Sequence, residues 1–289
     1  MINAEYLAEK GHNQKHIQMD QINFALVFSG KRHRPVILEI LPGSVRDYKA
    51  FDSIMERYDL RECIIIADRG LASYKMPAKK GIYLIVAIRR NFSIVDFNMD
   101  LDRSFIFRNR GINAGMKDLG DRILYMYEDT SLRAEEETNL IRKIESGEMS
   151  QKDLMEEKKK LGKFAILSNM RSDPREIYEL YKSREEVETA FDAMKNELEN
   201  DKAYVHTTEG LRGYFFISFI SLYMYFSILQ ALKDHDVSQK MSVKEVLFEL
   251  SKIYVIVNGA RRTLSEIQER SQKIADAFEL KLSPKILRN

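Results

Sequence analysis

Hydrophobic and polar residues divide the first part of the chain into short strands. Residues 18–29 place the apolar side chains Ile22, Phe24, Leu26 and Phe28 on one face of a strand. A basic turn separates them from an apolar run at 36–41, which predicts a β-hairpin. Residues 62–67 and 83–88 are continuous apolar runs, typical of strands buried on both faces of a sheet. With a helix expected over 44–58 and a helix-sized gap after the first apolar run, the order β-β-α-β-α-β predicts a mixed α/β sheet flanked by helices.

The pattern changes between residues 92 and 161. Short strand-like pieces there are followed by a highly charged stretch at 133–160, which predicts a solvated helical hairpin that turns at Gly147. We interpret this region as an inserted α/β segment. The predicted domains are therefore residues 1–91 and 162–231 for the two parts of the core, 92–161 for the insertion, and 232–289 for an all-helical C-terminal extension.

Helical patterns dominate after one further strand at 164–167. Asp173 and Pro174 are a suitable N-cap and first residue for a helix that continues through Lys195. The segment 213–229 carries no charge, and two readings are open: a membrane span or a buried central helix. Its length is at the lower limit for a span and three serines dilute it, so we favour a fully buried helix.

Composition places the chain among soluble globular proteins. It has 289 residues, 44% hydrophobic and 31% charged, with a net charge of +2 that does not by itself favour nucleic acid. Cys63 is the single cysteine and lies in an apolar run, so no internal disulfide is possible. A single cysteine fits the reducing cytoplasm, which is the expected location, and the first residues lack the pattern of a signal peptide.

Four polar residues in the helix after Pro174 have a spacing that suits chemistry on phosphate. Tyr181, Arg184, Glu188 and Lys195 lie at offsets of zero, three, seven and fourteen, which keeps them within roughly 60° on one helix. A carboxylate between two cations suits a divalent metal next to a phosphate. The same residues also fit an ordinary solvated helix face, with Arg184 and Glu188 as an i,i+4 ion pair.

Asp68 is a second candidate for a residue of the functional site. It follows the apolar run 62–67 directly, and a carboxylate at the carboxyl end of a strand points into the crevice where α/β sheets bind ligands. Alone, Asp68 is explained as a turn or cap residue. Together with Glu188 it predicts a site in which the two carboxylates meet, although a long segment separates them along the chain.

With these residues in place, the chain resembles the RNase H-like transposases of bacterial insertion sequences, in particular the insertion-sequence-four branch of the DDE class. The Tyr-x2-Arg-x3-Glu-x6-Lys signature of that branch is complete between Tyr181 and Lys195. The run that ends in Asp68-Arg69-Gly70 is similar to the strand of the second catalytic Asp, and residues 42–47 are similar to a Pro-Gly-Asn-x-x-Asp segment. Residues 207–219 also resemble the segment that follows the Glu helix.

The resemblance implies a fold and an activity. The fold is an RNase H-like mixed sheet, and the activity is Mg²⁺- or Mn²⁺-dependent cleavage and strand transfer at the ends of an insertion sequence, with two metal ions. Asp68 and Glu188 correspond to catalytic metal ligands. Tyr181, Arg184 and Lys195 correspond to residues that hold DNA phosphates. The implied partners are element-end and target DNA, with no membrane, and a homodimer is left open.

One departure affects the expected activity. The family uses three carboxylates, and its first Asp lies on a strand before the one at 18–29, so we expect an N-terminally truncated and impaired copy. Asp20 is a candidate substitute, although a solvent-facing Asp within a strand explains it more simply. Whether the chain is an enzyme is therefore open, the alternatives being a non-catalytic DNA-binding or oligomerising remnant and a different RNase H-like nuclease.

Basic clusters are candidates for contacts with DNA. They occur at Lys31-Arg32-His33-Arg34, Lys79-Lys80, Arg89-Arg90 and Lys158-Lys159-Lys160. Such runs are more often solvated surface, and they would indicate a DNA track only if several of them lined one groove with Glu188.

Overall fold

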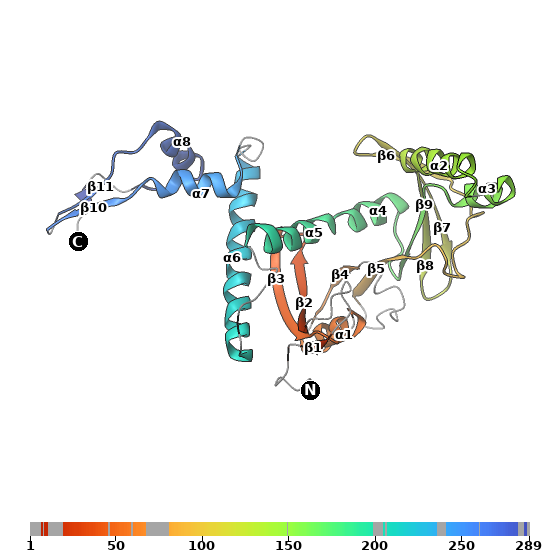
Figure 1. Ribbon diagram of the computed structural model, residues 1–289, viewed down its shortest axis with the longest axis horizontal. Helices are drawn as coiled ribbons and strands as arrows, with labels where there is room; N and C mark the ends of the chain where they lie inside the picture. The colour runs from red at the N-terminus through yellow and green to blue at the C-terminus, as the bar shows by residue number, and fades with distance from the viewer. Residues whose placement is uncertain are drawn as a thin grey trace. The chain divides into compact units, whose positions relative to one another are not determined.

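The chain divides into two compact units. Unit 1 comprises Met1–Glu5, Leu26–Ile40 and Glu186–Asn289, and unit 2 comprises Tyr6–Ala25 and Leu41–Glu185. The computed structural model (Figure 1) describes residues 7, 9–10, 20–45, 47–58, 60–67, 81–148, 150–198, 205, 207–235, 241–259, 261–282 and 286–287.

Most of the strands belong to unit 2. The hairpin strands β2 and β3 pass from one unit to the other, and together with β1 they form a three-stranded sheet in the order β1-β2-β3. The elements up to α4 are β1 (Glu9–Lys10), β2 (Asp20–Ser29), β3 (Arg34–Pro42), α1 (Asp47–Arg57), β4 (Cys63–Ala67), β5 (Ile82–Ile88), β6 (Arg103–Phe107), β7 (Arg110–Asp118), β8 (Ile123–Asp129), α2 (Thr130–Glu145), α3 (Gln151–Glu157), a 3-10 turn (Lys158–Lys160), β9 (Lys163–Ser168) and α4 (Pro174–Lys182).

A six-stranded mixed sheet forms the core of unit 2. Its strand order is β4-β5-β9-β8-β7-β6, in which β4 and β5 are parallel and every other neighbouring pair is antiparallel. Strands β6, β7 and β8 come from the segment that the sequence analysis assigned to an insertion, and they continue the same sheet as β4, β5 and β9. The predicted boundary at residue 92 is not tested by this arrangement and stays a prediction.

Both faces of this sheet are covered, and this explains the continuous apolar strands. Along β8, Tyr125 and Tyr127 face the cluster that includes Ile177 and Tyr178 of α4. The alternate residues of β8 face a second cluster, against which Phe51 of α1 and apolar side chains between residues 92 and 101 pack. All seven residues of β8 are buried. Because successive side chains of a strand point to opposite faces, a strand covered on both sides reads as uninterrupted apolar sequence.

Unit 1 contains most of the later helices. A small core forms where α6, α7 and α8 meet, around Leu232, Val243, Val246 and Ile274. The remaining elements are α5 (Glu185–Asp192), a π-helical turn (Ala193–Glu197), α6 (Thr208–Asp234), α7 (Val243–Ser251), β10 (Val255–Asn258), β11 (Arg261–Leu264), α8 (Glu269–Ala277) and β12 (Ile286–Leu287).

The fold class expected from the sequence is confirmed, and most predicted elements are present. The hairpin of β2 and β3, the strands β4 and β5, and the start of α4 lie where the pattern placed them, but β4 is only partly buried, with Ile64 40% exposed. The charged helical hairpin is also present as α2 and α3, and Gly147 between them has φ +78°, a conformation that favours glycine. The predicted helix between β4 and β5 lies outside the described residues.

Two predictions for the later part of the chain are wrong. The C-terminal extension is not entirely helical, because β10, β11 and β12 form a small antiparallel sheet. The β-branched run before Gly259 forms one strand of a hairpin there, and Gly259 has φ +62°, a conformation that favours glycine at the turn. Helix α6 is also not fully buried, since only 28% of its apolar window is buried.

Helix α6 is long and apolar enough to cross a membrane by length and composition. Its buried residues, among them Leu211, Phe215, Leu222 and Phe226, recur at the spacing of one helix face. Phe226 contacts Phe28 of β2 edge-to-face, with ring centroids 4.9 Å apart. One face of α6 therefore packs on protein within unit 1.

Raised pKa values in the aromatic core predict a loss of stability at high pH. Burial raises the pKa of Tyr178 to about 12, and the nearby negative charge of Asp129 adds to the effect. Because the unfolded phenol ionises near pH 10, the unfolded chain alone loses this proton between about pH 10 and 12, and the free energy of unfolding falls over that range. Urea unfolding at a series of pH values measures the fall.

The matched variant is Tyr178→Phe, which keeps the ring and removes the titrating group. It should reduce the fall without abolishing it, since burial also raises the pKa of Tyr125 and Tyr127. An identical pH dependence in the variant would contradict the assignment to Tyr178.

Candidate functional site

Helix α4 begins as the sequence predicts. The Asp173 carboxylate accepts a hydrogen bond of 2.8 Å from the backbone N–H of Arg175, and Pro174 occupies the first turn. Two tyrosines of β8 hold this start. The Tyr127 hydroxyl donates to the carbonyl of Pro174 at 2.7 Å, and Tyr125 Oη accepts from the N–H of Ser172 at 3.0 Å. The beginning of the signature segment is thus fixed to the sheet of unit 2.

The single helix predicted from Pro174 through Lys195 is wrong. α4 ends at Lys182 and α5 begins at Glu185. Between them, the N–H of Ser183 bonds to the carbonyls of Glu179 and Leu180, and its hydroxyl donates to Leu180 at 2.7 Å. A serine that bonds to the preceding turn competes with the regular helical pattern. The offsets of a single continuous helix therefore do not describe the signature residues.

Tyr181 and Arg184 stack on each other at the end of α4. The Arg184 guanidinium carbon lies 5.0 Å from the centroid of the Tyr181 ring, a cation–π contact. Tyr181 is only 6% exposed and belongs to the same core cluster as Tyr178, while Arg184 is half-buried. Tyr181 therefore has a structural role in unit 2, and its predicted contact with DNA stays a prediction.

Glu188 and Lys195 belong to unit 1, because the boundary between the units falls between Glu185 and Glu186. Glu188 lies on α5 and is exposed. Lys195 is also exposed and lies in the π-helical turn that extends α5. Their predicted roles as metal ligand and phosphate contact are not tested by the structure.

Asp68 lies outside the described residues. The strand before it is present: β4 ends at Ala67, which pairs with Val86 in the parallel register with β5. The predicted strand before Asp68 is therefore confirmed, whereas the role of Asp68 and its expected meeting with Glu188 stay predictions. The side chain of Asp20, the first residue of β2, also lies outside the described part of the chain.

The turn after β3 is built tightly around Gly43. A Cβ at this position would lie 2.1 Å from the carbonyl oxygen of Gln21, so only glycine fits. The Asn23 amide donates to the carbonyls of Gly43 at 3.0 Å and Val45 at 2.9 Å. The Pro-Gly segment therefore has a structural role, because its close packing on the backbone of β2 allows the chain to pass from β3 to α1.

Several of the predicted basic tracks are engaged within the protein. Arg90 pairs with Glu136 at 2.9 Å, Lys158 with Glu137 at 2.9 Å, and Lys160 with Glu157. These pairs favour the solvated-surface interpretation of the two runs. Lys31 and Arg32 are exposed at the tip of the β2–β3 hairpin, and Lys79-Lys80 lies outside the described residues.

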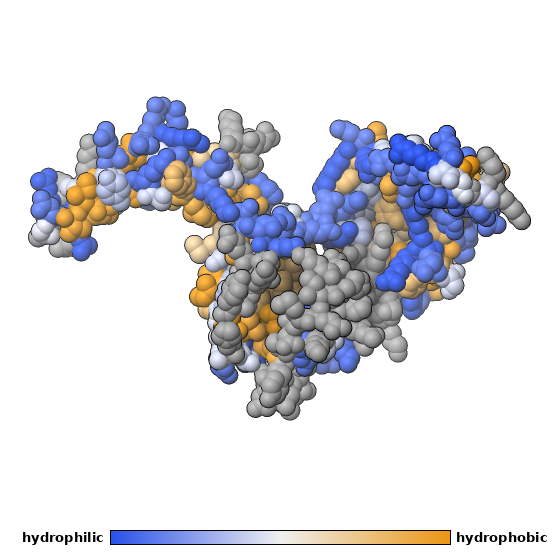
Figure 2. Space-filling model, in the orientation of Figure 1, coloured by the Kyte–Doolittle hydropathy of each residue, from blue (hydrophilic) through white to orange (hydrophobic). Residues whose placement is uncertain are grey.

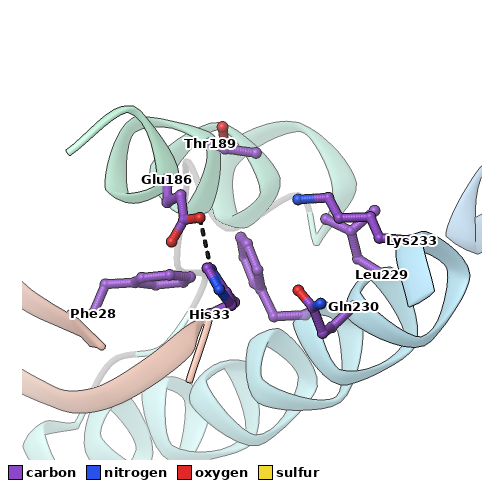
Figure 3. Close-up of a pocket in the computed structure, with 8 residues that line it drawn as sticks. Phe28, His33, Glu186, Thr189, Leu229, Gln230 and Lys233 are labelled. Carbon is purple, nitrogen blue, oxygen red and sulfur yellow. Dashed lines mark hydrogen bonds and ion pairs between the residues drawn. The ribbon is translucent and has the colours of Figure 1, made fainter. Parts of the chain in front are cut away.

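The hairpin tip also contributes a polar pair that sequence reasoning missed. His33 Nδ1 lies 2.7 Å from Glu186 Oε1 (Figure 3), and the other oxygen of Glu186 is buried with no hydrogen-bond partner among the described residues. The pair borders a small hollow within unit 1, also lined by Thr189, Gln230 and Lys233 and by the apolar side chains Phe28, Phe226 and Leu229. No local signal relates residues 153 positions apart, so only the fold reveals this pair.

The arrangement as a whole defines a class of protein. A mixed α/β sheet flanked by helices, with an acidic helix after its last strand and a helical C-terminal part, is the architecture of an RNase H-like transposase fold. Residues 4–224 match the family model described as the transposase DDE domain, and the chain belongs to this family. No curated protein and no solved structure matches the chain.

The DDE family generally uses divalent metal ions, so a complete site should bring several metal-binding side chains together. Among the residues that the structure describes, no group of three or more His, Cys, Asp or Glu side chains could hold one. The described part of the chain therefore does not complete a metal site, and Glu188 is the one predicted ligand that it contains.

The buried position of Tyr181 gives a testable consequence. Tyr181→Ala should lower the free energy of unfolding by about 3 to 5 kcal/mol, because it removes a large ring from the core of unit 2. Tyr181→Phe keeps the ring and should remain within about 1 kcal/mol of the unchanged protein. Chemical denaturation measures both values.

Tyr83→Ala is the matched control, because Tyr83 is exposed on β5 of the same unit. Its loss should cost much less than that of Tyr181. Equal destabilisation by the two alanine variants would show that Tyr181 is not part of the core.

Proposed function

We propose that the protein is a DNA transposase of the insertion-sequence-four branch. It cleaves phosphodiester bonds at the ends of an insertion sequence and joins the cleaved ends to target DNA. The supporting observation is that one family match spans residues 4–224 and so includes both Asp68 and the complete signature from Tyr181 to Lys195. Membership of the transposase family implies DNA as the partner. The branch, the strand-transfer chemistry and the residue roles are the proposal.

Each signature residue has a proposed role. Asp68 and Glu188 provide carboxylates for Mg²⁺ or Mn²⁺, with two ions at a complete site, and the metal stabilises charge on the phosphodiester when bound. Arg184 and Lys195 hold DNA phosphates through charge-assisted hydrogen bonds, and the Tyr181 ring orients the Arg184 guanidinium. Asp20 remains a candidate for a third carboxylate.

The proposed setting is the bacterial cytoplasm, where the protein meets chromosomal DNA. An exposed Glu188 and an exposed Lys195 are compatible with binding an extended backbone. The basic hairpin tip with Lys31 and Arg32 offers further positive charge in unit 1. A non-catalytic DNA-binding remnant is the alternative, and the activity test below separates it from an enzyme.

The proposal predicts that Glu188 is needed for DNA cleavage. In the presence of Mg²⁺ or Mn²⁺, the purified protein should nick or cut a plasmid that carries the element's ends. Glu188→Gln should reduce the rate at least about a hundredfold, because losing a metal-binding carboxylate removes several kcal/mol of transition-state stabilisation. Gel analysis of the plasmid products over time measures the rate.

Asp192→Asn is the matched control, since Asp192 is another exposed carboxylate on α5 that lies outside the signature. Asp192→Asn should cut the plasmid at close to the rate of the unchanged protein. If the unchanged protein binds end DNA in a salt-dependent manner but does not cut it, the remnant interpretation replaces the enzyme. Equal cutting by all three proteins would reject Glu188 as catalytic.

A further inference from the structure

Helix α6 is apolar on two opposite faces, and the described residues of unit 1 cover only one of them. The uncovered side chains, called here the α6 stripe, include Phe216 and Ile217, which are each 62% exposed. A helix that is apolar all round is normally buried all round. Figure 2 shows hydrophobic surface where α6 runs in Figure 1. The stripe consists of Phe216, Ile217, Ile220, Tyr223 and Met224.

The spacing of the stripe is that of a helix–helix contact. At about 100° per residue, its members lie within roughly 60° of Ile220, and the buried residues Leu211 and Leu222 lie on the opposite side. Gly213, Ile220 and Ser227 fall on one seam at seven-residue intervals, the repeat by which two helices pack along their length. No charged residue occurs between Gly213 and Leu232.

The stripe is also symmetric about Ile220. In an antiparallel pair with its two-fold axis at Ile220, Phe216 faces Met224 of the second helix and Ile217 faces Tyr223. The small residues Gly213 and Ser227 face each other at the two ends, where they allow close approach. Such self-complementarity is the requirement of a two-fold interface.

One edge of the stripe is held in place before any contact forms. Arg34 of β3 donates to the Tyr223 hydroxyl at 2.9 Å, and its guanidinium carbon lies 5.2 Å from the centre of the ring. The Tyr223 side chain is therefore ordered within unit 1. A preorganised side chain loses less entropy when a partner packs against it.

We propose that the α6 stripe binds the α6 stripe of a second copy of this chain, in an antiparallel pair centred on Ile220. The exposed parts of the five side chains offer on the order of 500 Å² per protomer, and two copies together bury about 1,000 Å², which reaches the lower range of specific interfaces. The uncharged part of α6 is long enough to cross a bilayer by length and composition. Its buried face, however, packs on protein within unit 1, where Phe226 contacts Phe28. The proposal does not rest on the proposed catalytic function.

Sedimentation of the full chain over a range of concentrations tests the pairing. The unchanged protein should show a reversible monomer–dimer equilibrium, and Phe216→Lys should raise the dissociation constant at least tenfold. Phe248→Lys is the matched control, because Phe248 is equally apolar and 65% exposed, but lies on α7. It should leave the equilibrium unchanged. Circular dichroism confirms that each variant is folded.

A charge-swap variant tests the antiparallel register. In the proposed pair, position 216 of each copy faces position 224 of the other. A variant with both Phe216→Lys and Met224→Glu therefore sets a positive charge opposite a negative charge at two places, and it should dimerise more tightly than either single variant. A parallel pair would instead set like charges together, and the double variant would then be the weakest. That result would overturn the register.

Three outcomes would overturn the proposal as a whole. The first is an unchanged protein that stays monomeric at all concentrations, as expected if another part of the same chain covers the stripe. The second is a dimer that Phe216→Lys and Phe248→Lys weaken equally. The third is flotation of the protein with phosphatidylcholine vesicles that Phe216→Lys abolishes, which would assign the stripe to a lipid surface. Loss of DNA cleavage in Glu188→Gln with dimerisation intact would leave the proposal standing.

Discussion

The position of the signature segment depends on two buried tyrosine hydroxyls. Tyr125 and Tyr127 lie side by side on β8, the most completely buried strand of unit 2, and bond to the backbone of the link from β9 to α4. A buried phenol that lost its partner would cost about 1 to 3 kcal/mol, so these bonds fix where α4 can begin. The rings of Tyr127, Phe164 and Tyr178 then pack on one another and hold the helix against the sheet.

This anchoring gives the middle of the chain a role in the site. Strand β8 comes from a region whose charged sequence suggested an insertion, yet it supplies both hydroxyls. A change in the β7–β8–β9 packing would therefore reach Tyr181 and Arg184 through α4. The opposite end of the signature, with Glu188 and Lys195, belongs to unit 1. The signature segment thus passes from unit 2 to unit 1 shortly after the turn at Ser183 and Arg184.

Helix α6 of unit 1 shows why the sequence of a long apolar helix does not predict which of its faces is buried. The residues of α6 that pack on protein and those of the α6 stripe have similar hydrophobicity, and their sequence gives no reason to separate them. What distinguishes them is which face packs on protein, as Phe226 does against Phe28 of β2.

Local sequence determined the parts of this protein that depend on neighbours in the chain. The β2–β3 hairpin, the apolar strands β4, β5 and β9, the N-cap of α4 and the family motifs all follow from periodicity, turn residues or short spacing, because hydrogen bonds and side-chain alternation act over a few residues. The strand β7 was missed, since its glycines and charged residues carry no clear period.

Tertiary structure decided the rest. Whether α4 continues into α5, whether the strands of residues 92–161 join the main sheet, and which face of α6 is covered all depend on contacts between segments far apart in sequence. The His33–Glu186 pair is the clearest example, since neither residue is unusual until the fold brings a hairpin tip to α5. Such contacts carry no local pattern because they are selected by the shape and chemistry of the assembled surfaces rather than by the backbone period.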